Sequence, residues 1–284
     1  MKNHKDLPII FLLLVIVLST SSCDLPGQGS EVSIEPTAVS SPAPEKKPTI
    51  DEHKYIFNGT ERTYLLRIPL ELDLTQPAQV VFVFHGMGEG PRDMIKAGFN
   101  PVADQETIIL VYPEVVSFTS PDFINQIILD MSDFVNIDPS RTYAMGFSMG
   151  GMLVYHAACE MSDTFAAFAA VSGMAICETA HISEEAVSIL HIHGLGDELV
   201  PYEGGRYGMP PVDETIAHWV QFNNCATSPL VETTDKITHT EYSQCREGAV
   251  IELYTIDGLG HKVPTKEMSS AKIIWDFFEA HPKP

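Results

Sequence analysis

Short apolar runs alternate with segments of helical periodicity along the chain from about residue 50 onward. Short apolar runs rich in β-branched side chains are typical of strands that are buried on both faces of a sheet. They predict strands at residues 79–84, 107–112, 142–147, 165–171, 187–192 and 250–256. Apolar residues that recur at the spacing of helical turns predict helices at residues 122–135, 149–159, 212–222 and 270–278.

Two alternating runs, residues 53–57 and 62–68, flank Asn58-Gly59 and predict an antiparallel hairpin before the first buried strand. Strands and helices that alternate along a chain favour parallel strands with helices packed on both faces. We therefore expect an α/β fold, with one doubly wound, mostly parallel sheet in a single domain over residues 51–284. The stretch 172–186 is too short to form a large lid.

The first 22 residues have the pattern of an export signal. Two lysines precede an apolar run at residues 7–18, and small polar residues lead to Cys23. The run is too short to cross a bilayer comfortably as a helix. Small residues directly before a cysteine resemble a bacterial lipoprotein signal, which implies lipidation of Cys23. Ordinary signal cleavage is the alternative, because Thr20 stands where that family usually has Leu.

Residues 23–50 are rich in Pro, Ser, Thr and Gly and predict a disordered tether, because they carry too little apolar surface to fold. We expect the domain on the extracellular side of a bacterial membrane, either lipid-anchored or secreted, with the lipid as its sole membrane contact. A formal net charge of -21 argues against a nucleic-acid partner, since phosphate binding requires clustered Lys and Arg. We expect a monomer.

Four cysteines remain after Cys23, and an oxidising compartment favours disulfides between them over the alternative of buried free thiols. Cys159 ends a predicted helix and Cys177 follows the next strand, while Cys225 follows a helix and Cys245 precedes the last strand. We predict the pairs Cys159–Cys177 and Cys225–Cys245, each closing a loop of roughly 20 residues.

Residues 146–150 read GFSMG, a GxSxG pentapeptide centred on Ser148. A predicted strand precedes the motif and a predicted helix follows it, which is the setting in which such a turn presents a nucleophilic serine. A serine hydroxyl is a poor nucleophile at neutral pH and needs a base that an acid orients. The alternative is a glycine-rich turn without chemistry, so the partners of Ser148 decide between the two.

Candidate partners of Ser148 follow two later strands, in the order acid and then base that this motif requires. HGLGD at residues 193–197 places Asp197 just past one strand, and DGLGH at residues 257–261 places His261 just past the last. Active residues of such sheets collect at the carboxyl ends of the strands. We therefore predict that Ser148, Asp197 and His261 form a catalytic triad.

Acyl transfer also needs N–H donors for the negative charge that develops on the substrate oxygen. The first predicted donor is the backbone N–H of Met149, directly after the serine. The second is the backbone N–H of Met87, in the HGMG loop that follows the 79–84 strand. We expect His85 in this loop to be structural.

His191 and His193 form an HxH pair of a kind that can ligate metal ions. We expect the two side chains to point to opposite faces of a buried strand and to pack in the core, so we predict no metal site.

Five motifs in order resemble the polyhydroxybutyrate depolymerase and feruloyl esterase group of α/β hydrolases. They are HGMG, GFSMGG, HIHGLGDELVPY, VDETIAHWVQFNNC and DGLGHKVP, and the similarity covers residues 55–280. The resemblance implies a secreted, single-domain esterase that acts on polyester, feruloyl or short acyl esters, small or polymeric, without a cofactor. It implies the same roles for Ser148, Asp197, His261, Met87 and Met149. The competing functions are a serine peptidase of the same fold and a non-catalytic surface binding protein.

Overall fold

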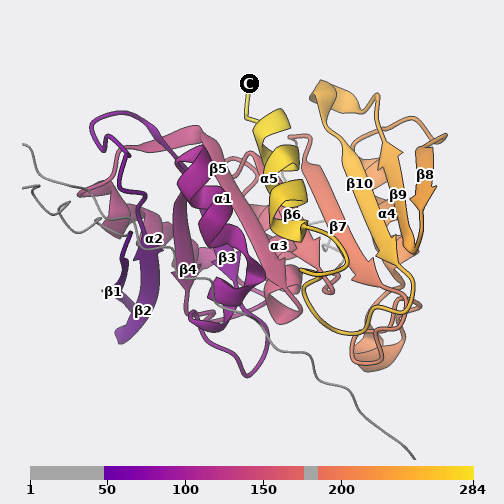
Figure 1. Ribbon diagram of the computed structural model, residues 1–284, viewed down its shortest axis with the longest axis horizontal. Helices are drawn as coiled ribbons and strands as arrows, with labels where there is room; N and C mark the ends of the chain where they lie inside the picture. Colours follow the sequence, from indigo (N-terminus) through magenta and orange to yellow (C-terminus); the bar gives the residue numbers. More distant parts are fainter. Residues whose placement is uncertain (1–47, 176–184) are drawn as a thin grey trace, which may run out of the picture. The chain divides into compact units, whose positions relative to one another are not determined.

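Ten strands form one mixed sheet in the part of the chain that the structure describes, residues 48–175 and 185–284. In this computed structural model the strands follow the order β1-β2-β4-β3-β5-β6-β7-β10-β9-β8 (Figure 1). They are β1 (Ile50–Phe57), β2 (Thr60–Arg67), β3 (Ala78–Phe84), β4 (Ile109–Pro113), β5 (Ile137–Phe147), β6 (Ala167–Val171), β7 (Ser188–Gly194), β8 (Leu230–Thr234), β9 (Ile237–Tyr242) and β10 (Ile251–Ile256). The six central strands, from β4 to β10, are parallel, and the two strands at each edge pair antiparallel.

The helices cover both faces of the sheet, as the α/β prediction requires (Figure 1). They are α1 (Phe99–Glu106), α2 (Asp122–Ser132), α3 (Met149–Glu160), α4 (Val212–Phe222) and α5 (Ser270–Ala280), with short 3₁₀ turns at η1 (Asp93–Ala97), η3 (Arg206–Gly208) and η4 (Arg246–Gly248). The apolar side chains of α1 and α5 belong to one buried cluster, and those of α2, α3 and α4 belong to a second. Strand β3 contributes side chains to both clusters, because alternate residues of a strand face opposite sides of the sheet.

Predicted and observed elements agree closely in the centre of the fold. The hairpin around Asn58-Gly59 is present with its predicted pairing, and α4 has the predicted bounds. Strand β4 begins two residues later than predicted, because Thr107 has a φ of 58° and closes α1. The sequence analysis assigned no helix before β4, and α1 buries only Phe99, Val102 and Ala103.

The antiparallel edge strands β8 and β9 were also not predicted. Every residue of β8 is exposed, and every residue of β9 is half-buried. An edge strand of this kind lacks the apolar alternation by which a half-buried strand is recognised. The sheet therefore extends two strands beyond the part that the apolar pattern marks.

Several predictions concern residues that lie outside the described part of the chain. These are the signal at residues 1–22, lipidation at Cys23, nearly all of the 23–50 tether, and Cys177. Within the described residues, none of the helices combines the length and the apolar character needed to cross a membrane.

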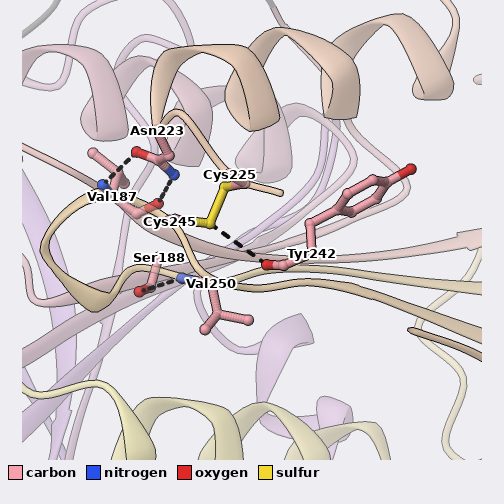
Figure 2. The surroundings of a disulfide bond; sticks show 7 residues. All are labelled: Val187, Ser188, Asn223, Cys225, Tyr242, Cys245 and Val250. Atoms are coloured by element: carbon pink, nitrogen blue, oxygen red, sulfur yellow. Dashed lines mark hydrogen bonds between the residues drawn. A yellow bond between two sulfur atoms is a disulfide. The ribbon is translucent and has the colours of Figure 1, made fainter. Parts of the chain in front are cut away.

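A disulfide joins Cys225 to Cys245, one of the two predicted pairs (Figure 2). Beside it, the buried Asn223 forms two hydrogen bonds with the backbone of Val187: its Nδ2 donates to the carbonyl at 2.7 Å, and its Oδ1 accepts the N–H at 3.0 Å. The disulfide and Asn223 thus tie the end of α4 to the starts of β7 and β10. These two strands lead to the loops that carry Asp197 and His261.

Cys159, at the end of α3, also takes part in a disulfide. Its predicted partner, Cys177, is not among the described residues, so the pair Cys159–Cys177 stays a prediction.

Candidate active site

Ser148 connects β5 to α3 in a backbone conformation that residues other than glycine rarely adopt, with φ 54° and ψ −117°. Two glycines make this turn possible. A Cβ on Gly146 would lie 2.2 Å from the carbonyl oxygen of Gly150, and a Cβ on Gly150 would lie 2.4 Å from that of Phe84. The turn places Ser148 at the carboxyl end of β5, with 8% of its surface exposed.

The imidazole of His261 lies between Ser148 and Asp197. Its Nε2 is 2.9 Å from Ser148 Oγ, and its Nδ1 is 2.7 Å from Asp197 Oδ2. Because an ionised carboxylate can only accept a hydrogen bond, Nδ1 carries the proton and Nε2 presents a lone pair to the hydroxyl. The structure therefore brings together the three residues predicted from the sequence, in the arrangement by which an imidazole can take a serine proton.

The carboxylate of Asp197 is completely buried and is held by three N–H groups. Its Oδ1 accepts the backbone N–H of Leu199 at 3.0 Å and that of Val200 at 2.8 Å, and its Oδ2 faces His261. A buried charge is tolerated when hydrogen bonds satisfy it. These donors also fix the direction in which the carboxylate points.

The loop that carries Asp197 and the loop that carries His261 are in direct contact. A Cβ on Gly194 would lie 2.2 Å from the carbonyl oxygen of Leu259, and the N–H of Gly196 donates to the same oxygen at 2.9 Å. The ring of Phe147, the residue before the serine, packs on the His261 ring with 4.8 Å between centroids. Both loop contacts and this ring position the imidazole.

His85 holds the loop after β3 rather than facing the nucleophile. Its Nδ1 lies 2.9 Å from the carbonyl oxygen of Gly86, and its Nε2 accepts the backbone N–H of Val115 at 3.0 Å. The loop passes close to the serine, because a Cβ on Gly86 would lie 3.3 Å from Ser148 Cβ. Met87 follows Gly86, and 74% of its surface is exposed.

Met149 begins α3, so its N–H belongs to the positive end of a helix. An anion at Ser148 would lie beside this helix end, where backbone N–H groups are not used within the helix. Met149 adjoins Ser148 and Met87 follows Gly86, so both stand next to residues that approach or carry the nucleophile, and their role as oxyanion donors stays a prediction.

Glu89 is a residue near the nucleophile that the sequence analysis missed. Its Oε2 accepts the N–H of Gly86 at 3.0 Å, and a Cβ on Gly86 would lie 3.1 Å from this oxygen. A carboxylate therefore lies against the loop that approaches Ser148. The signal in the sequence is slight: an acidic residue that closes a glycine-rich turn.

The prediction that His191 and His193 point to opposite faces of β7 was wrong. Residues two positions apart on a strand share a face. The two rings are parallel within 4°, and Nε2 of His191 lies 3.0 Å from Nδ1 of His193. Both are buried in the core as a hydrogen-bonded pair. Among the residues described, no group of three or more His, Cys, Asp or Glu side chains is arranged to hold a metal ion.

This chain is similar in sequence and in fold to known esterases. The Phospholipase/Carboxylesterase family model matches residues 119–210, which include Ser148 and Asp197. The bifunctional acetylxylan esterase/xylanase XynS20E of Neocallimastix patriciarum is 27% identical over 81% of this chain, and the match spans 34% of that longer protein. A probable feruloyl esterase C of Aspergillus niger is 25% identical over 84% of this chain and 91% of its own length.

The acetyl xylan esterase from Aspergillus awamori superposes with a TM-score of 0.61, at 16% identity, over 81% of this chain and 99% of that one. At that identity the superposition establishes the fold alone, and it agrees with the mostly parallel sheet and the helices on both faces. This chain therefore has the α/β-hydrolase fold and is related to carboxylic ester hydrolases of that fold.

Proposed function

We propose that this protein is a serine esterase that cleaves carboxylic esters through an acyl-enzyme. The observation that carries the proposal is the continuous hydrogen-bonded arrangement of Ser148, His261 and Asp197 at the carboxyl edge of the sheet. A non-catalytic binding protein would not need a strained serine with an aligned base, and a peptidase has no specific observation in its favour.

In the first half of the reaction, Ser148 Oγ attacks the ester carbonyl carbon while its proton moves to His261 Nε2. The N–H groups of Met87 and Met149 stabilise the negative oxygen of the tetrahedral intermediate. Collapse breaks the bond to the alcohol, which leaves with the proton from His261. A water molecule then attacks the acyl-enzyme by the same steps in reverse, releasing the acid and restoring Ser148. Asp197 stays ionised and stabilises the imidazolium.

We further propose acetyl, short acyl or hydroxycinnamoyl esters of a bulky or polymeric alcohol as substrates, with a polyester as the alternative. The names of the relatives, acetylxylan esterase and feruloyl esterase, support this class. Exposed apolar side chains on the loops of the site also support it: Met87, Leu195 and Leu199 are 74%, 50% and 48% exposed. Such side chains offer an apolar rim to an aromatic acyl group or a polymer, and methionine adapts to varied shapes. Export and a lipid anchor at Cys23 would place the site where insoluble substrates are found.

The acyl chain length tests the substrate proposal. We expect kcat/KM to be highest for p-nitrophenyl acetate to butyrate in a series from about two to sixteen carbons, with methyl ferulate also cleaved. Each methylene that finds no apolar surface forfeits roughly 1 kcal/mol of transition-state binding. The Ser148→Ala variant measures the background rate. A maximum at about twelve carbons or more would contradict the proposal and indicate a lipase.

Removing the charge of Glu89 tests how the site treats anionic acyl groups. Glu89→Gln keeps an oxygen that can accept the Gly86 N–H but removes the carboxylate. At roughly 7 Å in water two like charges repel by about 0.6 kcal/mol, so we expect kcat/KM for p-nitrophenyl hemisuccinate to rise about threefold relative to p-nitrophenyl butyrate. The two acyl groups have the same length, and the difference should shrink in high salt. An unchanged ratio at low salt would show that Glu89 does not act on the acyl group.

A further inference from the structure

Strand β7, which leads to the loop of the candidate acid, carries a buried chain of hydrogen bonds. Tyr155 on α3 lies with its hydroxyl 2.7 Å from Nδ1 of His191. Nε2 of His191 is 3.0 Å from Nδ1 of His193, and Nε2 of His193 is 2.9 Å from the carbonyl oxygen of Val200. The imidazoles are both 0% exposed, and Tyr155 is 1% exposed. None of these side chains has a role in the proposed reaction steps.

The chemistry of each partner sets the direction of this chain. The Val200 carbonyl can only accept, so His193 must donate to it from Nε2. A neutral His193 then accepts at Nδ1, so His191 donates from Nε2 and accepts the Tyr155 hydroxyl proton at Nδ1. Every polar atom of both imidazoles is thus used once, which satisfies groups that would otherwise be costly to bury.

This series of hydrogen bonds requires both imidazoles to be neutral, and their surroundings favour the neutral state. Burial lowers the pKa of His193, and burial together with the nearby His193 lowers the pKa of His191 well below its usual value. The titratable groups that face the pair are Tyr155 from α3, Tyr202 from the loop before α4, and Asp197 and His261 from the two site loops.

The last partner in this series of hydrogen bonds, Val200, also binds the candidate acid. Val200 accepts from His193 at its carbonyl and donates its N–H to Asp197 Oδ1 at 2.8 Å. His193 Nε2 itself lies 3.7 Å from Asp197 Oδ2, the oxygen that faces His261. Movement of His193 would therefore displace Val200 and the carboxylate together.

We infer that Tyr155, His191 and His193 are positioning residues for the ester hydrolysis, which hold Val200 and through it the direction of the Asp197 carboxylate. The inference rests on the proposed function, because it assigns Asp197 the orienting role in a triad. The buried hydrogen bonds connect α3 to the loop that carries Asp197.

The test compares His193→Phe, which keeps an aromatic ring but removes both hydrogen bonds, with His193→Gln, which keeps a donor toward Val200. Rates are expressed per serine titrated with a fluorophosphonate probe. For His193→Phe we expect kcat on p-nitrophenyl acetate to fall roughly 10- to 100-fold with KM little changed, the penalty of a misplaced catalytic group. We expect His193→Gln to recover most of the loss.

The pH profile separates positioning from simple destabilisation. A misdirected carboxylate stabilises the His261 imidazolium less, so the acid limb of kcat/KM should move to lower pH in His193→Phe. The matched control is Phe168→Leu, a buried core substitution in β6 that lowers stability but changes none of the residues in this series of hydrogen bonds. If His193→Phe fails to fold, the same measurements are made on His191→Gln and Tyr155→Phe. We expect a smaller fall in kcat and a smaller shift of the acid limb in these two variants.

Normal kcat per titrated serine with an unmoved acid limb would overturn the inference. An equal shift of the acid limb in Phe168→Leu would overturn it as well. The low-field NMR proton between His261 and Asp197 provides a readout that does not depend on turnover. Its resonance should shift in His193→Phe and stay in place in Phe168→Leu. A wild-type protein that shows this proton but hydrolyses no ester would refute the proposed function and leave the positioning role standing.

Discussion

Replacing Ser148 by Ala is expected to abolish most ester hydrolysis while the fold stays intact. The loss should be on the order of 10⁴-fold or more in kcat, because the nucleophile, base and acid act as one unit. Asp197→Ala and His261→Ala should be similarly severe, and combining them should add little. The measurement is p-nitrophenyl acetate hydrolysis by purified variants whose circular dichroism spectra match the wild type.

Labelling by a fluorophosphonate probe provides a second readout of the nucleophile. The wild type should be labelled at one serine, and Ser148→Ala should not be labelled. Ser228→Ala, an exposed serine beyond α4, is the matched control and should retain full activity and labelling. Turnover above about a tenth of the wild-type rate in Ser148→Ala would refute the assignment of the nucleophile.

Removing the Cys225–Cys245 disulfide is expected to lower the free energy of unfolding by about 3 kcal/mol in the chain-entropy model. The bridge closes a loop with a sequence separation of 20 residues and ties the end of α4 to the segment before β10, the strand that leads to His261. For a domain of this size the loss corresponds to a fall in Tm of roughly 6–12 °C. The double variant Cys225→Ser/Cys245→Ser should show it in thermal and urea unfolding.

The activity per titrated serine should change little in this double variant at temperatures well below its Tm, because neither cysteine touches the triad. The double variant also leaves the disulfide of Cys159 intact, which chemical reduction would not. An unfolding midpoint equal to that of the wild type would mean that Asn223 and the surrounding core hold this region without the bridge.

Local patterns in the sequence were enough to predict the central elements and the three residues of the candidate triad. Buried parallel strands need continuous apolar runs, which is why β3 and β7 could be located near their observed bounds. Strand β5 begins at Ile137, earlier than the predicted residue 142, because its first five residues are not fully buried and lack the apolar run. The carboxyl ends of such strands meet at one edge, so Ser148, Asp197 and His261 could be brought together without a structure. The GxSxG turn carries its own signal, because only glycine permits the close backbone contacts on either side of the serine.

Elements outside the buried core could not be predicted in this way. Strands β8 and β9 pair at the edge of the sheet through backbone hydrogen bonds, which any sequence can form, and they have no buried face. Helix α1 has only 8 residues, so its buried Phe99, Val102 and Ala103 give a single helical repeat, which is too short to mark a helix in the sequence. Their presence follows from the sheet and helices beside them rather than from their own residues.

Contacts between separate segments depend on the tertiary structure. Glu89 contacts Gly86 within one turn after β3, but only the folded chain brings that turn against Ser148. His191 and His193 share a face by strand geometry, but only the packing of α3 and the acid loop around β7 supplies Tyr155 at one end and Val200 at the other. The central strands and helices and the strand ends that carry chemistry could be predicted, since both depend on local apolar pattern and order. The orientation of the acid depends on atoms from separate segments, which come within hydrogen-bonding distance only after the chain has folded.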